Sequence, residues 1–280
     1  MIAKKITIPD IKDRKRSGPP IAMLTAYDYP WALLVDRAGI DMILVGDSLG
    51  MVVLGYADTI SVTMEEMLHH IKAVTRTVER AVVLGDMPFG SYNVSKKEAV
   101  KNANRIMKEG RADGIKLEGG RSMAATVKAI VDSGTPVQGH IGLTPQTASA
   151  LGGFKVQGKS AAAARALIDD AKSLEDAGAF SLILEAIPAP IAKLVTQAVS
   201  IPTIGIGAGV DCDGQVLVTH DMVALFDRFT PKFVKQYAKI SNIITKAIAD
   251  YRDDVQNRRF PAEEHSFLMK AEELDKLTGK

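Results

Sequence analysis

The sequence has a single cysteine and no long apolar run. Cys212 cannot form an internal disulfide, which fits a protein of a reducing compartment. No stretch reaches the roughly 18 uncharged apolar residues of a membrane-spanning helix. The first residues also lack the apolar core of a secretory signal. We therefore expect a cytoplasmic protein that does not enter a membrane.

An excess of charge of either sign is also missing. The 35 Lys and Arg residues almost balance the 33 Asp and Glu residues, which leaves a net charge of +2. Binding to nucleic acid requires a basic surface, and the short basic cluster at residues 12–16 does not supply one, so nucleic acid is not an expected partner. Hydrophobic residues make up 46% of the 280-residue chain, which is enough for a sizeable core.

Short apolar runs that end in small or polar residues alternate with longer segments of helical periodicity. Continuous Ile, Val and Leu are typical of strands that are buried on both faces of a parallel sheet. The predicted strands are Ile21–Tyr27, Met42–Asp47, Ala81–Pro88, Gly114–Gly120, Pro136–Gly142, Ser181–Ala186, Pro202–Gly209 and Gln215–Asp221. The predicted helices between them are Tyr29–Ala38, Thr63–Thr77, Ser95–Glu109, Ser122–Ser133, Lys159–Ala177 and Ala189–Ser200.

Eight strands separated by crossovers, at roughly 25–30 residues per unit, predict an α/β fold of the (β/α)8 TIM-barrel type. A doubly wound open sheet is the alternative, but its polar residues would gather at one switch point. Here polar residues follow nearly every strand, which favours the barrel. We expect residues 1–280 to form one barrel domain with a C-terminal helical extension from about residue 231, where a helical pattern runs from Pro231 to about Arg258.

Three carboxylates end three successive predicted strands. Asp47, Asp86 and Glu118 would converge at the mouth of a barrel, where catalytic groups lie. Each one alone fits a helix cap or a loop ion pair. Three on consecutive strands, with no cysteine or paired histidine nearby, instead favour a site of hard oxygen ligands for Mg²⁺.

Two further ionisable residues, Lys116 and His140, lie at the same predicted rim. Lys116 and Glu118 are two residues apart, so both would face the lumen, where Lys116 could hold a substrate carboxylate or a developing enolate oxygen. A Schiff-base role for Lys116 is an alternative, although a neighbouring carboxylate favours the protonated amine. His140 should also face the lumen, either as a catalytic group or as a hydrogen-bonded core histidine.

Glu185 ends an apolar strand on the opposite side of the barrel. A carboxylate in that position suits a general base that removes a proton next to a carbonyl group, whereas a salt bridge to the following loop is the alternative. The glycine-rich segment 205–209 is a weak signal for phosphate binding, because no basic residue follows it and its spacing differs from the dinucleotide motif. Close packing explains these glycines equally well.

Several of these segments together resemble the ketopantoate hydroxymethyltransferase family. The matching stretches cover most of the chain: MLTAYDYPWA (23–32), GDSLGMVVLGY (46–56), GDMPFGSY (85–92), KLEGG (116–120), GHIGLTPQ (139–146), GGFKVQGK (152–159), LEAIP (184–188), GIGAGVDCDGQVLVTHD (205–221) and FPAEEHSF (260–267). The resemblance implies a barrel of the phosphoenolpyruvate/pyruvate superfamily that assembles as a homodecamer. It also implies transfer of a hydroxymethyl group from 5,10-methylenetetrahydrofolate to 3-methyl-2-oxobutanoate in pantothenate biosynthesis.

The resemblance also implies roles for individual residues. The positions that match Asp47, Asp86 and Glu118 hold Mg²⁺ in that family, and the residue that matches Glu185 accepts a proton. Lys116, Asp86 and Ser48 correspond to residues that contact the keto acid. Together these roles imply an enolate mechanism in which Mg²⁺, Lys116 and His140 stabilise the developing charge.

Two other functions are alternatives. A lyase or phosphonopyruvate mutase of the same superfamily would place a reactive cysteine or a set of arginines at the barrel mouth, and neither is visible in the sequence. A non-catalytic barrel that serves as a scaffold would have apolar or capped strand ends, which the polar rim contradicts.

Overall fold

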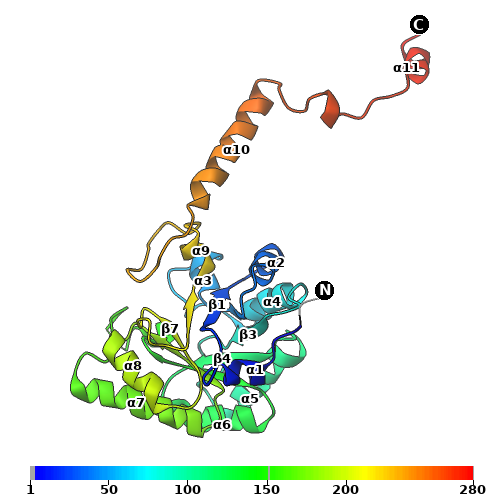
Figure 1. The fold of residues 1–280 in the computed structure, drawn as a ribbon. Helices are drawn as coiled ribbons and strands as arrows, with labels where there is room; N and C mark the ends of the chain where they lie inside the picture. The colour runs from blue at the N-terminus through cyan, green and yellow to red at the C-terminus, as the bar shows by residue number, and fades with distance from the viewer. Residues whose placement is uncertain (1–3, 151, 280) are drawn as a thin grey trace.

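Eight parallel strands close into a barrel in the computed structural model, which describes residues 4–150 and 152–279 (Figure 1). This arrangement confirms the predicted (β/α)8 fold. The strands are β1 (Ile21–Thr25), β2 (Met42–Val45), β3 (Val82–Asp86), β4 (Gly114–Glu118), β5 (Val137–Gly142), β6 (Ser181–Glu185), β7 (Thr203–Ile206) and β8 (Gly214–Leu217). Each pairs with its neighbours in sequence, and β8 pairs with β1.

Alternation along the strands divides the core into two clusters. Met42 and Leu44 of β2 belong to the cluster inside the barrel, whereas Ile43 and Val45 belong to the larger cluster between the strands and the surrounding helices. Successive side chains of a strand point to opposite faces, so strands buried on both sides need the continuous apolar runs seen in the sequence.

Helices surround the barrel and follow most of the strands. They are α2 (Tyr29–Arg37), α3 (Leu49–Val52), α4 (Met64–Thr75), α5 (Lys96–Lys108), η1 (Arg121–Met123) with α6 (Ala124–Asp132), η2 (Pro145–Thr147), α7 (Ala161–Asp176), α8 (Ala189–Ala198) and α9 (Thr219–Met222). Helix α4 begins with a capping box, in which Thr63 and Glu66 exchange hydrogen bonds, as its sequence favours. No helix in the described part of the chain is both long and apolar enough to span a membrane.

A short N-terminal helix that the periodicity did not reveal, α1 (Ile8–Asp13), closes one end of the barrel. Its Ile11 is fully buried in the inner cluster beside Ile21 and Val82. Two isoleucines, Ile8 and Ile11, in a helix of 6 residues are too few for a periodicity signal. The basic residues 12–16 lie at the end of this helix, where Lys15 forms an ion pair with Asp213 at 2.9 Å.

The last strand differs from the prediction. β8 ends at Leu217 rather than Asp221, because the backbone N–H of Thr219 donates to the hydroxyl of Thr25 and the Thr219 hydroxyl donates to the carbonyl of Thr25. The chain then turns into α9, which carries His220 and Asp221. Residues 207–213 also join β7 to β8 without a helix in the described chain, so one of the eight expected crossovers is only a loop.

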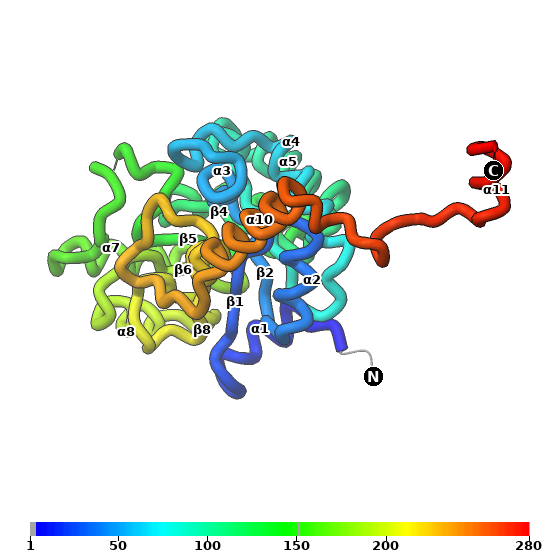
Figure 2. Tube along the Cα trace, turned by 90° about the horizontal axis from the view of Figure 1, so that it is seen from above, coloured from blue at the N-terminus to red at the C-terminus, as the bar shows by residue number. Residues whose placement is uncertain are grey.

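The C-terminal extension rises from the end of the barrel that carries α3 and α9 (Figures 1 and 2). Its helix α10 (Ile240–Gln256) begins nine residues later than the pattern from Pro231 suggested. The residues before it instead dock on α9, with the N–H of Tyr237 bonded to the Met222 carbonyl and that of Ile240 to the Val223 carbonyl. The extension continues through η3 (Glu263–His265) to α11 (Ala271–Thr278).

Candidate active site

A cavity of about 360 Å³ opens at the carboxyl ends of the strands. It collects all of the predicted site residues: Asp47, Ser48, Asp86, Lys116, Glu118, His140 and Glu185. Strand register explains their proximity, because Asp86 lies beside Lys116 on β3 and β4, and Glu118 lies beside His140 on β4 and β5. Strands therefore hold five of these side chains, whereas Asp47 and Ser48 lie in the turn between β2, which ends at Val45 rather than at the predicted Asp47, and α3.

Lys116 neutralises the carboxylate of Asp86. Its Nζ lies 2.8 Å from both Asp86 oxygens and 3.8 Å from Oε1 of Glu118, and all three side chains are buried. Burial by itself would lower the pKa of Lys116, but the charges of Asp86, Glu118 and Asp47 outweigh it and hold the pKa above its ordinary value. The amine is therefore protonated at neutral pH, which removes the Schiff-base alternative and leaves an electrostatic role.

Asp47 lies beside Asp86 at the mouth of the barrel. The backbone N–H of Asp47 donates to Oδ2 of Asp86 at 3.3 Å, and Oδ2 of Asp47 accepts a 2.9 Å hydrogen bond from the side-chain amide of Gln146. Burial, followed by the charge of Asp86, raises the pKa of Asp47 well above its ordinary value. Two desolvated carboxylates this close favour a bound cation.

His140 lies between Glu118 and Glu185. Its Nδ1 is 3.4 Å from Oε1 of Glu118, and its Nε2 is 3.3 Å from Oε2 of Glu185. Burial would lower the pKa of His140, but its interactions with the two carboxylates prevail and raise it to about 9. An imidazolium that lies between the predicted base and Glu118 favours the catalytic alternative for His140 over that of a core histidine.

The charges in the cavity fit a divalent cation. Among the described residues, the only cationic groups within ion-pair distance of Asp47, Asp86, Glu118 and Glu185 are Lys116 and His140, which leaves two negative charges unpaired when all four carboxylates are ionised. Lys155 and Lys232 also line the cavity but form no ion pair with these carboxylates. Among the described residues, however, no three His, Cys, Asp or Glu side chains converge closely enough to enclose a metal ion unaided. The residues therefore suit an ion such as Mg²⁺, which keeps several water or substrate oxygens in its coordination shell. They suit an ion that is coordinated by protein ligands alone less well.

Two further polar groups border the metal-site candidates. The hydroxyl of Tyr27 lies 2.8 Å from Oγ of Ser48, and the Ser48 side chain faces the same cavity. Burial raises the pKa of Tyr27, so its hydroxyl stays protonated and can orient Ser48 by hydrogen bonding. Ser48 is thus placed to offer a hydroxyl group to a ligand in the cavity.

The backbone after Glu185 is strained. Ala186 has a φ of 48°, a left-handed conformation that is unfavourable for alanine, and its N–H is bonded to the Ile206 carbonyl. The Glu185 carbonyl accepts a hydrogen bond from the N–H of Leu143. These two bonds end β6 at Glu185 and keep its side chain at the cavity wall, where it is 16% exposed.

The glycine-rich segment 205–209 serves packing. A Cβ at Gly207 would lie 2.7 Å from the Phe233 ring, and one at Gly209 would lie 2.4 Å from the Ala189 Cβ. The positive φ angles of these two glycines, 64° and 84°, add a backbone reason for glycine. Close approach of the chain therefore accounts for this segment without a phosphate.

Gln146 is the main site residue that the sequence did not single out. Its side-chain amide nitrogen donates to Asp47 and to the Met87 carbonyl, its side-chain oxygen accepts from the hydroxyl of Tyr92, and its backbone N–H donates to Glu118 at 3.0 Å. It thereby ties two carboxylates of the candidate metal site together. A neutral glutamine on the short helix η2 has no charge or spacing signal, so only the tertiary contacts reveal it.

The outer wall of the cavity is apolar and aromatic, which the strand pattern also did not predict. It comes largely from the segment after α9, through Phe226, Phe229 and Phe233, together with Phe154 from the loop before α7. Phe229 is 66% exposed and Phe154 60% exposed. These flat side chains form a surface suited to an aromatic ligand next to the polar floor.

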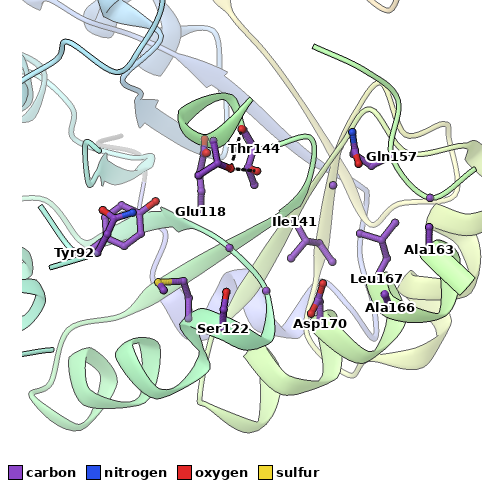
Figure 3. A pocket seen from close by; sticks show the side chains of 17 residues that line it. Tyr92, Glu118, Ser122, Ile141, Thr144, Gln157, Ala163, Ala166, Leu167 and Asp170 are labelled. Atoms are coloured by element: carbon purple, nitrogen blue, oxygen red, sulfur yellow. Dashed lines mark hydrogen bonds between the residues drawn. The ribbon is translucent and has the colours of Figure 1, made fainter. Parts of the chain in front are cut away.

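A second hollow of about 400 Å³ lies on the other side of Glu118, between the ends of β4 and β5 and helix α7 (Figure 3). Its lining includes Thr144, Leu167 and Asp170. One oxygen of Asp170 accepts hydrogen bonds from the backbone N–H and the Nε of Arg121, at 2.9 and 3.1 Å. This hollow contains neither the candidate base nor the Lys116–Asp86 pair.

The cavity does not match the lyase or mutase alternative. Among the described residues that line it there is no arginine and no cysteine. Cys212 instead lies buried beside β7, where its sulfur would be 2.9 Å from a Cβ placed at Gly205. The charged floor equally contradicts a purely structural barrel, because buried charges are costly to maintain without a function.

A sequence model of the family described as ketopantoate hydroxymethyltransferase matches residues 5–263. The 3-methyl-2-oxobutanoate hydroxymethyltransferase of Heliobacterium modesticaldum is 58% identical over 268 residues, which are 96% of this chain and 97% of that protein.

Similar solved structures include phosphonopyruvate hydrolase, with a TM-score of 0.61 and 12% identity over 98% of this chain and 95% of that one. A complex of phosphonopyruvate hydrolase with oxalate and Mg²⁺ has a TM-score of 0.58 and 13% identity, over 98% of this chain and 95% of that one. At such low identity the likeness concerns the fold alone.

Proposed function

Because this chain belongs to the ketopantoate hydroxymethyltransferase family, we propose that it transfers a hydroxymethyl group from 5,10-methylenetetrahydrofolate to 3-methyl-2-oxobutanoate. The observation that carries the proposal is the convergence of Lys116, Asp86, His140 and Glu185 in one cavity. In this set, Lys116 is a cationic site for a 2-oxo acid, and Glu185 is a carboxylate base beside the imidazolium of His140. Such groups are needed to remove a proton next to a carbonyl group.

The keto acid binds on the floor of the cavity. Lys116 provides the positive charge that attracts its oxygens, and the hydroxyl of Ser48 offers a hydrogen bond. Leu44, Ile183 and Val216 line the same cavity, so the branched alkyl part of the substrate has apolar contacts. Burial of the Lys116 charge strengthens its attraction for a negatively charged oxygen, since few water molecules screen it.

Glu185 removes the proton from C3 of the bound keto acid. Its Oε2 lies 3.3 Å from Nε2 of His140, so the imidazolium orients the carboxylate and compensates its charge. The negative charge that develops on the substrate oxygen is stabilised by Lys116. The resulting carbon nucleophile then attacks the methylene carbon of the folate, and water releases the hydroxymethyl product.

Asp47, Asp86 and Glu118 are the residues that would hold Mg²⁺, with Asp86 also in contact with Lys116 and through it with the substrate. When bound, Mg²⁺ supplies a Lewis acid that makes the C3 proton of a 2-oxo acid more acidic. The unbalanced charge of the carboxylates supports this assignment, and the phosphonopyruvate hydrolase complex contains Mg²⁺ on a similar fold.

Exchange of the C3 proton with solvent deuterium tests the proposal. Glu185→Gln should slow this exchange by about 10²–10⁴-fold, because general-base catalysis contributes that much, while the keto acid still binds. Glu109→Gln, which alters an exposed ion pair with Arg105 on α5, is the matched control and should exchange normally. Exchange at the normal rate in Glu185→Gln would remove Glu185 from the role of base. A parallel assay of folate-dependent keto-acid consumption, with and without Mg²⁺, tests the whole reaction.

We also propose that the protein works in the cytoplasm as a homodecamer. Helix α10 supports assembly, because none of its residues, all within the described chain, is buried and a stripe of Ile244, Ile248, Tyr251 and Val255 lies exposed at helical spacing. Ile248→Glu should lower the mass measured by light scattering. Lys246→Glu, which places the same charge elsewhere on α10, should leave the mass unchanged.

A further inference from the structure

Among the described acidic residues that line the cavity, Asp221 is the one that has no role in the proposed mechanism. It lies on α9, directly after β8, and lines the same cavity as Lys116 and Glu185. Its exposed fraction is only 9%, yet its carboxylate forms no hydrogen bond or ion pair with any residue that the structure describes. Asp47, Asp86, Glu118 and Glu185 all have partners.

The position of Asp221 is well defined. The N–H and hydroxyl of Thr219 both bond to Thr25, which anchors the first turn of α9 to β1. The neighbouring His220 packs its ring against Tyr27 and Trp31, at centroid distances of 5.3 and 5.4 Å. The backbone of Asp221 is thus fixed by its neighbours while its side chain has no protein partner, which leaves the carboxylate available to a ligand atom rather than engaged in a structural contact.

The surroundings of Asp221 fit the second substrate better than the first. The residues that follow it, Phe226, Phe229 and Phe233, form the aromatic outer wall of the cavity, whereas the keto acid needs the charged floor. An aromatic heterocycle would lie against this wall with its polar atoms near Asp221. Lys232 also lines the cavity but forms no ion pair with Asp221, so the carboxylate stays available.

Burial favours the protonated form of this carboxyl group. Desolvation raises the pKa of Asp221 to about 6, and no neighbouring charge opposes it. A carboxylic acid whose pKa is raised toward neutrality is suited to donate a proton and to recover it within one catalytic cycle. Glu185, which has to accept a proton, instead lies beside the imidazolium of His140.

We propose that Asp221 is a catalytic general acid that protonates a nitrogen of the one-carbon donor as the bond from that nitrogen to the methylene carbon breaks. This inference rests on the proposed function. The electron pair of the broken bond stays on the nitrogen and takes the Asp221 proton. The methylene carbon remains bound to the second nitrogen as an iminium ion, which is the electrophile for the C3 nucleophile.

The proton balance of the full cycle closes without another reactant. Water adds its hydroxyl group to the transferred carbon when the bond to the second nitrogen breaks. Asp221 has supplied the first N–H group of the released tetrahydrofolate. Of the proton that Glu185 took from C3 and the remaining proton of this water, one supplies the second N–H group and the other passes to Asp221. Asp221 thereby returns to its protonated form, and no oxidant or reductant is needed.

Asp221→Asn in the full-length protein tests this role through three reactions. C3 proton exchange should stay within about twofold of the normal rate, because it needs only the floor of the cavity. Transfer from 5,10-methylenetetrahydrofolate should fall in kcat by about 10²–10⁴-fold, with little change in the folate KM. Transfer from formaldehyde, which has no carbon–nitrogen bond to break, should be retained.

Asp170→Asn is the matched control, since it makes the same substitution in the neighbouring hollow beyond Glu118. It should support all three reactions at the normal rate. Four results for Asp221→Asn would overturn the proposal: folate-dependent transfer at the normal rate, an effect confined to KM, loss of C3 exchange, or equal loss of the formaldehyde reaction. Failure of the unmodified protein to exchange or transfer would instead overturn the proposed function, and with it this inference.

Discussion

The ammonium group of Lys116 lies 2.8 Å from both carboxylate oxygens of Asp86, and both side chains are buried. Removal of one partner from such a pair leaves the other charge buried without compensation. Here the loss of Lys116 would leave Asp86 among Asp47 and Glu118 with no cation close to it. The pair is therefore a structural requirement of the cavity as well as part of the proposed substrate site.

Lys116→Met should lower the free energy of unfolding by about 3–5 kcal/mol in the absence of divalent ions. Urea denaturation at one protein concentration, with a chelator present, measures this loss. Lys193→Met removes an exposed ion pair with Asp211, with side-chain exposures of 52% and 40%, and should cost less than about 1 kcal/mol. Equal, small effects of the two substitutions would show that the buried pair is not important for stability.

Mg²⁺ should bind the folded protein with release of protons, because burial and Asp86 raise the pKa of Asp47 and a metal ligand has to be deprotonated. The affinity for Mg²⁺ therefore rises with pH over the range in which Asp47 loses its proton. Calorimetric titration in buffers of different ionisation enthalpy counts the protons released. Asp47→Asn should weaken Mg²⁺ binding and reduce this count, whereas Asp170→Asn should change neither; unchanged binding by Asp47→Asn would contradict the assignment.

Gln146→Leu should weaken Mg²⁺ binding by about 10–100-fold, as is typical when a residue that orients metal ligands is lost. Asp47 would lose its amide donor and Tyr92 its acceptor, while the backbone bond to Glu118 would remain. Titration calorimetry measures the affinity, and Gln197→Leu on the exposed side of α8 serves as the control. Normal affinity in Gln146→Leu would mean that Gln146 does not position the candidate ligands.

His220 should make the protein less stable in acid. Burial lowers the pKa of His220 below its ordinary value of 6.5, so the unfolded chain takes up a proton more readily than the folded one. The free energy of unfolding therefore falls as the pH drops below about 6.5 toward the lower folded-state pKa.

His220→Phe keeps a ring beside Tyr27 and Trp31 but cannot titrate. The difference in unfolding free energy between pH 7.5 and pH 5.5, from urea denaturation, should be smaller in this variant than in the unmodified protein. The exposed His69 supplies the control substitution His69→Phe. An identical acid dependence in the unmodified protein and His220→Phe would exclude His220 as a source of the effect.

Much of the fold could be predicted because a strand buried on both faces has to be apolar throughout. Each of the eight apolar runs overlaps a strand, and each run ends in the small or polar residues that mark a barrel rim. The residues at which individual strands and helices begin and end were less predictable. β8 stops at Leu217 because Thr219 bonds to Thr25, a residue 194 positions away, and α10 begins late because the segment before it docks on α9. Contacts between distant segments leave no local pattern.

The sequence by itself determined the barrel and the ring of ionisable residues at its mouth, because period and strand position are local properties. Asp47, Asp86, Lys116, Glu118, His140 and Glu185 needed only that reasoning to be singled out. Tertiary structure alone decided how they are paired: Lys116 on Asp86, and His140 between two glutamates. It also decided that Gln146 joins the cluster and that Asp221 stays without a partner, since pairing and desolvation depend on neighbours that folding brings together.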